Sequence, residues 1–294
     1  MQIKKPIFIN GFQRGGTNIF VNLIASHPQV STVGKEMHEV FYGVGRAPLS
    51  KIFSRLINAP LLLGSNDFYK ISNYEPRKSL PSWMMKYSDL QLNLNKIFAT
   101  ENYRKAGGQR YTLWEVYGTR IVVKNVNGAV LISKEFEKYY PDAVFISVLR
   151  NGLALCEGFV RRGWTARDFG LLYQTVSDAM LEFSANQSKH LIVKFEELLE
   201  NPQEMLENIY RHCGLPINQL AHFRMHAKAS MNEDGHREFK LGIKDRQEIW
   251  LERPEINSFF RKEVNQHQIK RLTPSDRDKF LEIANNAMEK WGYL

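Results

Sequence analysis

A glycine-rich turn near the start of the chain contains residue types that suit an anion. The turn lies between the apolar run Pro6–Asn10 and the segment Thr17–Ser26, in which apolar residues recur at helical spacing. Gly15 and Gly16 allow backbone amides to close around an anion, and the amino terminus of the following helix adds partial positive charge. An ordinary tight turn before a capped helix uses the same glycines, so the glycines alone leave both interpretations open.

The side chains of the turn favour the anion site. Arg14 contributes a full positive charge, Thr17 can cap the helix and offer its hydroxyl, and Asn18 supplies an amide donor. The turn does not match a Walker A loop, GxxxxGKS/T, because Thr-Asn rather than Lys-Ser or Lys-Thr follows Gly16. A standard magnesium-nucleotide kinase is therefore disfavoured.

A second arginine directly follows a predicted central strand. Ala143–Leu149 is a continuous apolar run, as expected for a strand buried on both faces, and Arg150 comes next. Ligands of open α/β sheets bind at the carboxyl ends of the strands, so Arg150 is well placed to bind a phosphate.

The elements that must position these residues alternate between short strands and longer helices. Further strands are predicted at Val30–Val33, Arg120–Val123 and Leu191–Phe195, and helices at Pro202–Cys213 and Thr273–Trp291. This alternation predicts an α/β fold in which helices flank a central parallel sheet, a three-layer arrangement. We find no repeat or linker and expect one domain over residues 1–294.

Two stretches of this domain differ from the alternating pattern. Residues 43–108 contain four prolines and no strong strand signal, which predicts a mostly helical insertion. Residues 217–265 are polar and basic with few strand signals, which predicts a loop or cap over a site. The cap contains four basic residues that could complete a phosphate site or simply be solvated: Lys240, Lys244, Arg261 and Lys262.

The composition favours anionic ligands without naming them. The 294 residues include 40 Lys and Arg against 31 Asp and Glu, a net charge of +9, which suits nucleic acid, membranes or small phosphorylated molecules. No apolar run reaches the roughly 18 residues of a membrane span, and Ile7–Ile9 is too short for a signal peptide, so we expect a soluble, cytoplasmic protein. Cys156 and Cys213 have no ligand spacing, which predicts buried thiols and no structural zinc.

Several segments together resemble the sulfotransferase family. Residues 14–18, Arg-Gly-Gly-Thr-Asn, between a strand and a helix that runs into Ala-Ser-His-Pro, resemble the 5′-phosphosulfate loop of that family. The resemblance implies a P-loop-like α/β fold, 3′-phosphoadenosine 5′-phosphosulfate (PAPS) as sulfuryl donor, 3′,5′-adenosine bisphosphate (PAP) as its product, and no metal. Further segments with family-like sequences extend the match over nearly the whole chain: Pro141–Ala143, Phe195–Leu198, Asn201–Pro202, Gly214–Pro216 and Gly292–Tyr293.

The resemblance also implies how the rest of PAPS is bound. In the family, an arginine after the central strand and a serine eight positions later bind the 3′-phosphate, and these positions hold Arg150 and Gly158 here. Without the serine, the 3′-phosphate must be met by the Gly158 amide, by Arg161 or Arg162, or less completely. Phe195 is implied to lie near the adenine, although a phenylalanine at this point is also typical of core packing.

Sulfuryl transfer needs a cation at the leaving oxygen and a base for the acceptor proton. Arg14 with the loop amides fits the first role, by the electrostatic logic of phosphoryl transfer. The base should be a carboxylate or imidazole on the side of the sulfur opposite Arg14.

Three residues after the second strand are candidates for this base. The chain is most similar to the bacterial and tyrosylprotein-type branch of the family, and alignment through His27–Pro28 and Gly34 puts Glu36 at that branch's catalytic glutamate, with a one-residue insertion. His38 is the second candidate, because the cytosolic branch uses histidine, and Glu39 is the third. A solvated acidic turn is the ordinary alternative.

The sequence therefore supports three classes of function. The first is a PAPS-dependent sulfotransferase acting on a hydroxyl or amine of a small-molecule or glycan acceptor. The second is a P-loop-like nucleotide kinase with an unusual loop, and the third is a basic nucleic-acid-binding protein, for which no recognisable binding motif is found. The acceptor and the oligomeric state stay open. Aromatic residues of the insertion could line the acceptor pocket or form their own core: Phe53, Phe68, Tyr69, Tyr74, Trp83 and Tyr87.

Overall fold

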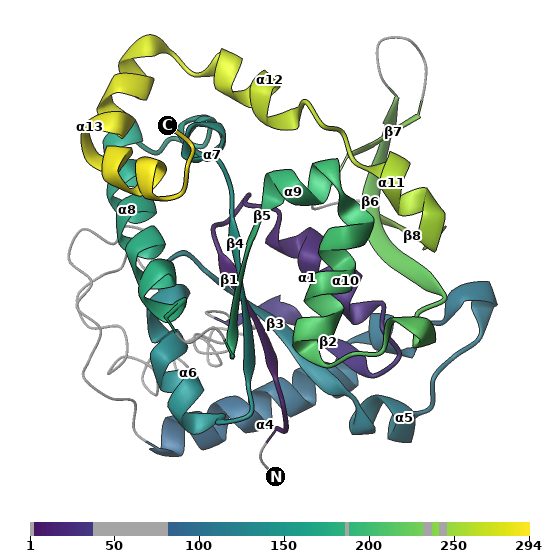
Figure 1. The fold of residues 1–294 in the computed structure, drawn as a ribbon. Coiled ribbons are helices and arrows are strands. Elements are labelled where there is room, and N and C mark those ends of the chain that lie inside the picture. The colour runs from purple at the N-terminus through teal and green to yellow at the C-terminus, as the bar shows by residue number, and fades with distance from the viewer. Residues whose placement is uncertain (1–2, 38–81, 186–187, 232–236, 241–245) are drawn as a thin grey trace.

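A five-stranded parallel sheet forms the centre of the protein (Figure 1). The computed structural model describes residues 3–37, 82–185, 188–231, 237–240 and 246–294. The strands follow the order β2-β3-β1-β4-β5 and are all parallel. They are β1 (Ile7–Gly11), β2 (Val30–Glu36), β3 (Arg120–Val126), β4 (Val144–Leu149) and β5 (His190–Lys194). The predicted α/β fold with a parallel sheet is confirmed, and β2 extends three residues beyond its predicted end.

Helices cover both faces of this sheet (Figure 1). On one face, α1 (Thr17–Ala25) and α10 (Pro202–Cys213) share a core with alternate residues of β1, Ile7 and Ile9. On the other face, α4 (Ser82–Phe98) and α6 (Ser133–Tyr139) share a core with Phe8. Successive residues of β1 thus enter opposite layers, as a strand buried on both faces requires.

A third core lies at the carboxyl end of the sheet. It combines α7 (Gly152–Val160), α8 (Ala166–Phe183) and α13 (Pro274–Lys290) with Phe12 of the glycine turn. The remaining helices are α5 (Leu113–Gly118), α9 (Phe195–Glu200), α11 (Ile256–Phe259) and α12 (Val264–Arg271). Because α13 packs on α7 and α8, the end of the described chain helps to position the turn.

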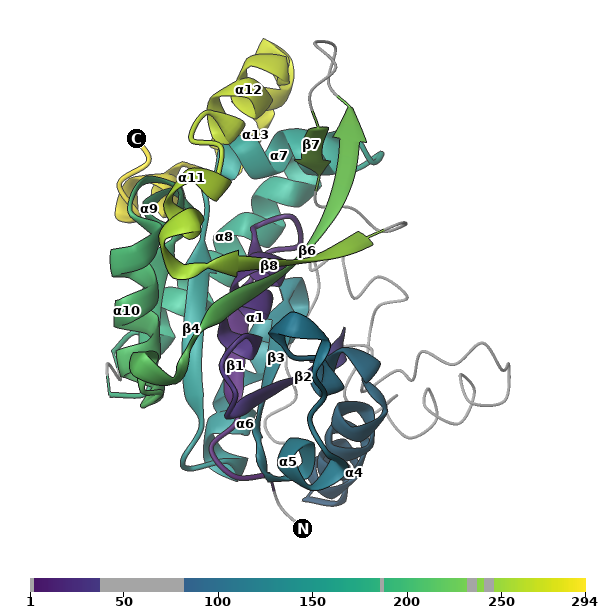
Figure 2. The same cartoon turned by 90° about the vertical axis from the view of Figure 1, so that its right-hand side faces the viewer.

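A second sheet lies beside α1 (Figure 2). It is antiparallel, has the order β7-β6-β8, and consists of β6 (His222–Met231), β7 (Arg237–Lys240) and β8 (Arg246–Glu252). The polar, basic composition of residues 217–265 predicts a loop or cap with few strands, whereas the structure has three strands within this segment. Phe223 and Met225 are buried in the core around α1. These two apolar residues alternate as in a strand, but the many charged residues around them gave the segment no clear strand signal.

The predicted helical insertion is described only in its second part. Residues 38–81 lie outside the described residues, and 82–108 form α4 and two short 3₁₀ segments. Cys156 and Cys213 are free and buried, and burial raises the pKa of each thiol to about 12. Among the described residues, no helix has the length and apolar character needed to cross a membrane.

Gly152 allows α7 to pack tightly beneath α13. A Cβ added at Gly152 would lie 2.6 Å from Phe280 Cζ and 2.7 Å from Met288 Sδ, both on α13. The helix begins at this point because the Asn151 side chain accepts from the Leu153 amide at 3.0 Å, a regular N-cap.

Replacing Gly152 by Ala is expected to destabilise the protein by about 1–3 kcal/mol, because the added methyl group overpacks the core. Urea unfolding of the variant and the wild type measures this difference. Gly118→Ala is the matched control, since no atom lies within 4 Å of a Cβ added there. Equal unfolding midpoints for the two variants would contradict the packing argument.

Candidate active site

The turn after β1 is held by its backbone conformation and by a buried anchor. Gly16 has a φ of +89° and Arg14 a φ of +66°, and a left-handed conformation at a residue with a side chain is typical of functional sites. The Gly15 amide donates to the Phe12 carbonyl at 3.0 Å. Phe12 is fully buried and stacks on Tyr173 of α8, with ring centroids 5.0 Å apart. The turn is therefore shaped by the protein itself.

Several backbone amides of the turn remain available to a ligand. The Gln13 amide is used internally, since it donates to Asn127 Oδ1 at 3.0 Å. Within the described part of the chain, the amides of Gly16, Thr17 and Asn18 have no protein acceptor. These amides open the first turn of α1, where an anion is favoured by hydrogen bonding and by the helix dipole.

The prediction that the Thr17 side chain caps α1 is wrong. Gly16 occupies the N-cap position, and α1 has no side-chain cap. Thr17 is buried, and its methyl group lies against Gly11, where an added Cβ would be 2.9 Å from Thr17 Cγ2. The absence of a side-chain cap fits a helix terminus that receives an anion instead.

Arg150 brings a buried guanidinium to the turn. Its NH1 donates to the Arg14 carbonyl at 2.6 Å, its Nε to Asn265 Oδ1 at 2.8 Å, and its NH2 to Gln268 Oε1. The guanidinium lies over the Phe195 ring, 4.6 Å from the centroid. Burial lowers the pKa of Arg150 to about 10, against the opposing effect of nearby carboxylates. The group is thus charged at neutral pH.

Phe195 packs between the two basic segments. Its ring is only 4% exposed, and a Cβ added at Gly16 would lie 2.4 Å from Phe195 Cδ2. Gly16 is therefore required both for its positive φ and for this contact. Phe195 also belongs to the core around α1, so the core-packing interpretation of this residue is borne out.

A third arginine converges on the same region from the end of α7. Arg162 NH1 donates to the Gly158 carbonyl at 2.6 Å. Burial lowers the pKa of Arg162, and the positive charges of Arg14 and Arg161 lower it further. An anion bound near Arg162 would offset this repulsion.

Helix α12 fills the space beside Gly158. A Cβ added at Gly158 would lie 3.9 Å from both Arg162 NH1 and Gln268 Nε2. Gln268 also donates to Glu157 Oε2 at 3.3 Å. Because Gly158 lies inside α7, its amide is used by the helix, which removes it as a phosphate donor.

Glu36 is paired with a lysine across the sheet. Its Oε1 lies 2.5 Å from Lys124 Nζ, and Lys124 also donates to Asn18 Oδ1. Gly34, with a φ of +63°, lies in a β-bulge between Thr32 and Glu36, and this bulge brings Glu36 opposite Lys124. A carboxylate, an ammonium and the loop thus meet at one edge of the sheet.

The other predicted site residues lie on other elements or are not among the described residues. Arg161 is exposed and pairs with Glu157 at 3.5 Å. Arg261 and Lys262 are exposed between α11 and α12, and Lys240 ends β7. In the insertion, Trp83 is exposed and Tyr87 half-buried.

Among the described residues, no group of three His, Cys, Asp or Glu could hold a metal ion. Several predicted residues lie outside the described part: His38, Glu39, Lys244, Phe53, Phe68, Tyr69 and Tyr74.

A sequence model of the sulfotransferase family matches residues 6–219, and a second model, the sulfotransferase domain, matches residues 154–292. The first match spans more than half of the chain. This chain belongs to the sulfotransferase family. Sulfotransferases are enzymes that transfer a sulfuryl group, so the prediction of sulfuryl transfer is confirmed against the kinase and the nucleic-acid-binding protein. No curated protein matches the chain.

Several solved sulfotransferase structures are similar to this sulfotransferase. The sulfotransferase domain of the curacin biosynthetic pathway is 13% identical over 96% of this chain and 98% of its own, with a TM-score of 0.48. Sulfotransferase STF1 from Mycobacterium tuberculosis H37Rv is 20% identical over 73% and 68%, with a TM-score of 0.40. Mouse sulfotransferase SULT7A1, solved with PAP, is 13% identical over 97% and 85%, with a TM-score of 0.42. The family assignment rests on the sequence models.

The structure adds four residues to the candidate site of this sulfotransferase. Lys124 could have been found as the charged residue that follows the apolar run Arg120–Val123. Glu196 stands in a family-like segment, and it accepts from the Asn151 amide at 2.9 Å and from the Tyr293 hydroxyl at 2.8 Å. Two other residues gave no sequence signal, because only the packing of α12 brings them to Arg150: Asn265 and Gln268.

Proposed function

We propose that this sulfotransferase uses PAPS as its sulfuryl donor and binds it between the turn after β1 and Arg150. The observation that carries the proposal is the contact of the Arg150 guanidinium with the Arg14 carbonyl, in the same turn as three amides that have no acceptor among the described residues. Such a cradle suits a molecule with two separated anionic groups. In this arrangement the 5′-phosphosulfate would bind to the loop amides, and the 3′-phosphate would bind to Arg150.

The adenine is proposed to lie beside Phe195. The ring contacts Gly16 of the turn and Arg150, so it stands between the residues proposed for the two anionic groups. Because the ring is nearly buried, its main effect would be to fix Gly16 and Arg150 relative to each other. The donor binding site is thereby preorganised.

In the proposed reaction, PAPS supplies the SO₃ unit, the acceptor oxygen or nitrogen forms a bond to sulfur, and the bond from sulfur to the bridging phosphate oxygen breaks. Arg14 and the loop amides stabilise the charge that develops on this oxygen. Glu36 accepts the acceptor's proton, and Lys124 holds the carboxylate at the edge of the sheet next to Asn18. His38 and Glu39 remain the alternative bases.

The 3′-phosphate is proposed to be bound without a serine. Gln268 and Arg162 both lie 3.9 Å from the position of a Cβ at Gly158, so they surround the place of the missing side chain. Gln268 also contacts Arg150 directly. The amide of Gln268 and the guanidinium of Arg162 would therefore replace the serine hydroxyl as donors.

The acceptor is proposed to be a hydroxyl or amine on a small molecule or glycan, and the membership of the bacterial and tyrosylprotein-type branch stays a prediction. The two buried cysteines are free, which fits the predicted cytoplasmic location, since disulfides are rare in reducing compartments.

PAP binding in the absence of Mg²⁺ tests the proposed donor. Isothermal titration calorimetry of the whole chain is expected to give tight binding of PAP without metal and weak binding of ATP, because the cradle consists of amides and guanidinium groups. Binding of ATP that depends on Mg²⁺, with no binding of PAP, would overturn the proposal.

Replacing Glu36 by Gln is expected to lower turnover by about 100-fold or more, because a general base is lost, while PAP affinity stays nearly unchanged. Transfer of label from PAPS to an acceptor found by screening phenols, carbohydrates and lipid glycans measures turnover. Glu39→Gln, at one of the alternative bases, is measured in parallel and should keep near-normal turnover if Glu36 is the base. Near-normal turnover of the Glu36 variant would assign the base to His38 or Glu39.

Replacing Gln268 by Ala is expected to weaken PAP binding about tenfold or more, the effect of losing one hydrogen bond to a charged group. Binding of AMP, which lacks the 3′-phosphate, should change little. Adding Gly158→Ser to the Gln268 variant should restore PAP affinity, because space for a side chain exists there. An equal loss for PAP and AMP would show that Gln268 acts only on the fold.

A further inference from the structure

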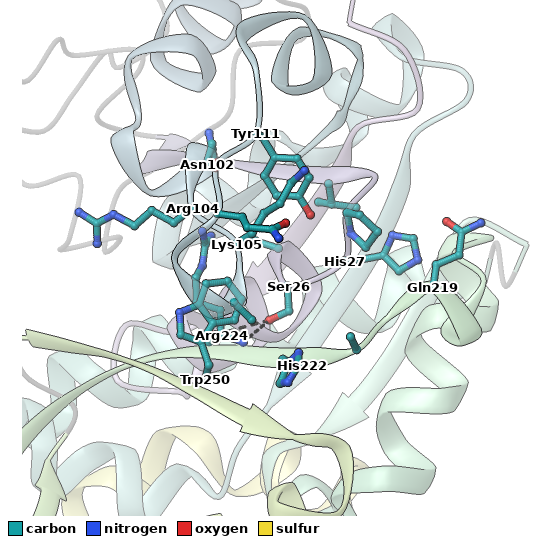
Figure 3. A pocket seen from close by; sticks show the side chains of 16 residues that line it. Ser26, His27, Asn102, Arg104, Lys105, Tyr111, Gln219, His222, Arg224 and Trp250 are labelled. Carbon is teal, nitrogen blue, oxygen red and sulfur yellow. Dashed lines mark hydrogen bonds between the residues drawn. The ribbon is translucent and has the colours of Figure 1, made fainter.

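A cavity lies at the opposite end of α1 from the glycine turn. Its volume is about 290 Å³, and it is bounded by the end of α1, by residues 102–111, and by β6 and β8 (Figure 3). Gly16 caps the start of α1, whereas Ser26, just after its end, lines the cavity. A helix of nine residues is about 13 Å long, so this α1–β6 cavity is separate from the proposed donor site.

The lining of the α1–β6 cavity is positively charged. It includes Arg104, Lys105 and Arg224, and none of the sixteen residues that line it is Asp or Glu. Figure 3 shows Arg104 and Lys105 on one side of the cavity and Arg224 on the other. Three carboxylates outside the lining offset this charge: Glu248 lies 3.2 Å from Arg104, Glu115 lies 3.3 Å from Lys105, and Glu101 and Glu248 favour the charged form of Arg224.

Arg224 is a buried cation with an unused donor. It is 4% exposed, and its NH1 donates to the Glu101 carbonyl. Its buried Nε has no hydrogen-bond partner among the described residues. The protein therefore leaves one donor of this buried guanidinium unsatisfied, although buried polar groups in proteins nearly always have a partner.

Other residues of the cavity are committed to the fold or offer an aromatic surface. His27 is fully used, since Nε2 bonds to the Pro216 carbonyl at 3.0 Å and Nδ1 accepts from the Gln29 amide at 3.2 Å. Lys105 covers the Tyr111 ring at 4.0 Å from its centroid. Trp250 is half-buried, and its Nε1 donates to Glu248, which fixes the indole at the wall of the cavity. A planar ring can pack against it.

We propose that the α1–β6 cavity is a second ligand site, which binds a small organic anion with one planar ring. The Arg224 guanidinium, which lines the cavity, would donate to the anionic group, Arg104 and Lys105 would add charge, and Trp250 would contact the ring. The volume is at the lower end of the range for small-molecule sites, which favours a single ring over a nucleotide. Aryl phosphates, sulfates and carboxylates share this chemistry.

Calorimetric titration of the whole chain with phenyl phosphate, in the presence of saturating PAP, tests this site. One molecule is expected to bind per chain. Inorganic phosphate, which lacks the ring, and phenol, which lacks the anionic group, should each bind about tenfold more weakly. Phenyl sulfate and benzoate then identify the preferred anion. Equal binding of phenol would overturn the anion site, and loss of all phenyl phosphate binding when PAP is present would place the ligand in the donor site instead.

Variants separate the cavity from nonspecific binding. Arg224→Met should lower the affinity for phenyl phosphate about tenfold or more, by loss of a charged hydrogen bond. Because Arg224 is buried, Trp250→Leu and Lys105→Met provide independent tests that do not remove a buried charge. Lys138→Met, at an exposed lysine of α6, is the charge-matched control. Unchanged binding in the Trp250 and Lys105 variants would overturn the proposal.

Discussion

The hydrogen bond from the Arg150 guanidinium to the Arg14 carbonyl joins the two halves of the proposed donor site. A buried guanidinium is stable only when its donors are satisfied, and this one uses the turn, Asn265 and Gln268 for that purpose. The same contact sets the backbone of the turn next to the carboxyl end of β4. The spacing of the two proposed phosphate sites therefore depends on a single charged group and its acceptors.

The strand order explains why this contact can form. β1 lies between β3 and β4, so the turn after β1 has Lys124 on one side and Arg150 on the other. The chain leaves β1 toward β2 and later crosses to β4 on its other side, which creates the switch point where open α/β sheets bind ligands. The residues proposed for the reaction therefore come from four adjacent strands, β2, β3, β1 and β4, or from the turns that follow them.

Parts of the chain that are distant in sequence keep Arg150 in place. Glu196 accepts from the Asn151 amide, from Asn265 and from the Tyr293 hydroxyl, so one carboxylate links α7, α12 and the segment after α13. Tyr173 supports the turn by stacking on Phe12 and also donates to the Arg150 carbonyl at 3.2 Å. The family-like segments around Phe195 and Tyr293 thus both help to hold Arg150 in position.

The sequence alone determined the five strands, their parallel arrangement and the two arginines at strand ends, because these depend on local periodicity and on short motifs. It also indicated Glu36, whose place follows from its position after a short strand. Only the tertiary structure decided that β6 to β8 form a sheet, that Lys124 pairs with Glu36, and that Asn265 and Gln268 contact Arg150. These contacts join residues that are 88 and more than 110 positions apart, and side-chain hydrogen bonds between distant segments leave no periodic pattern in a single sequence.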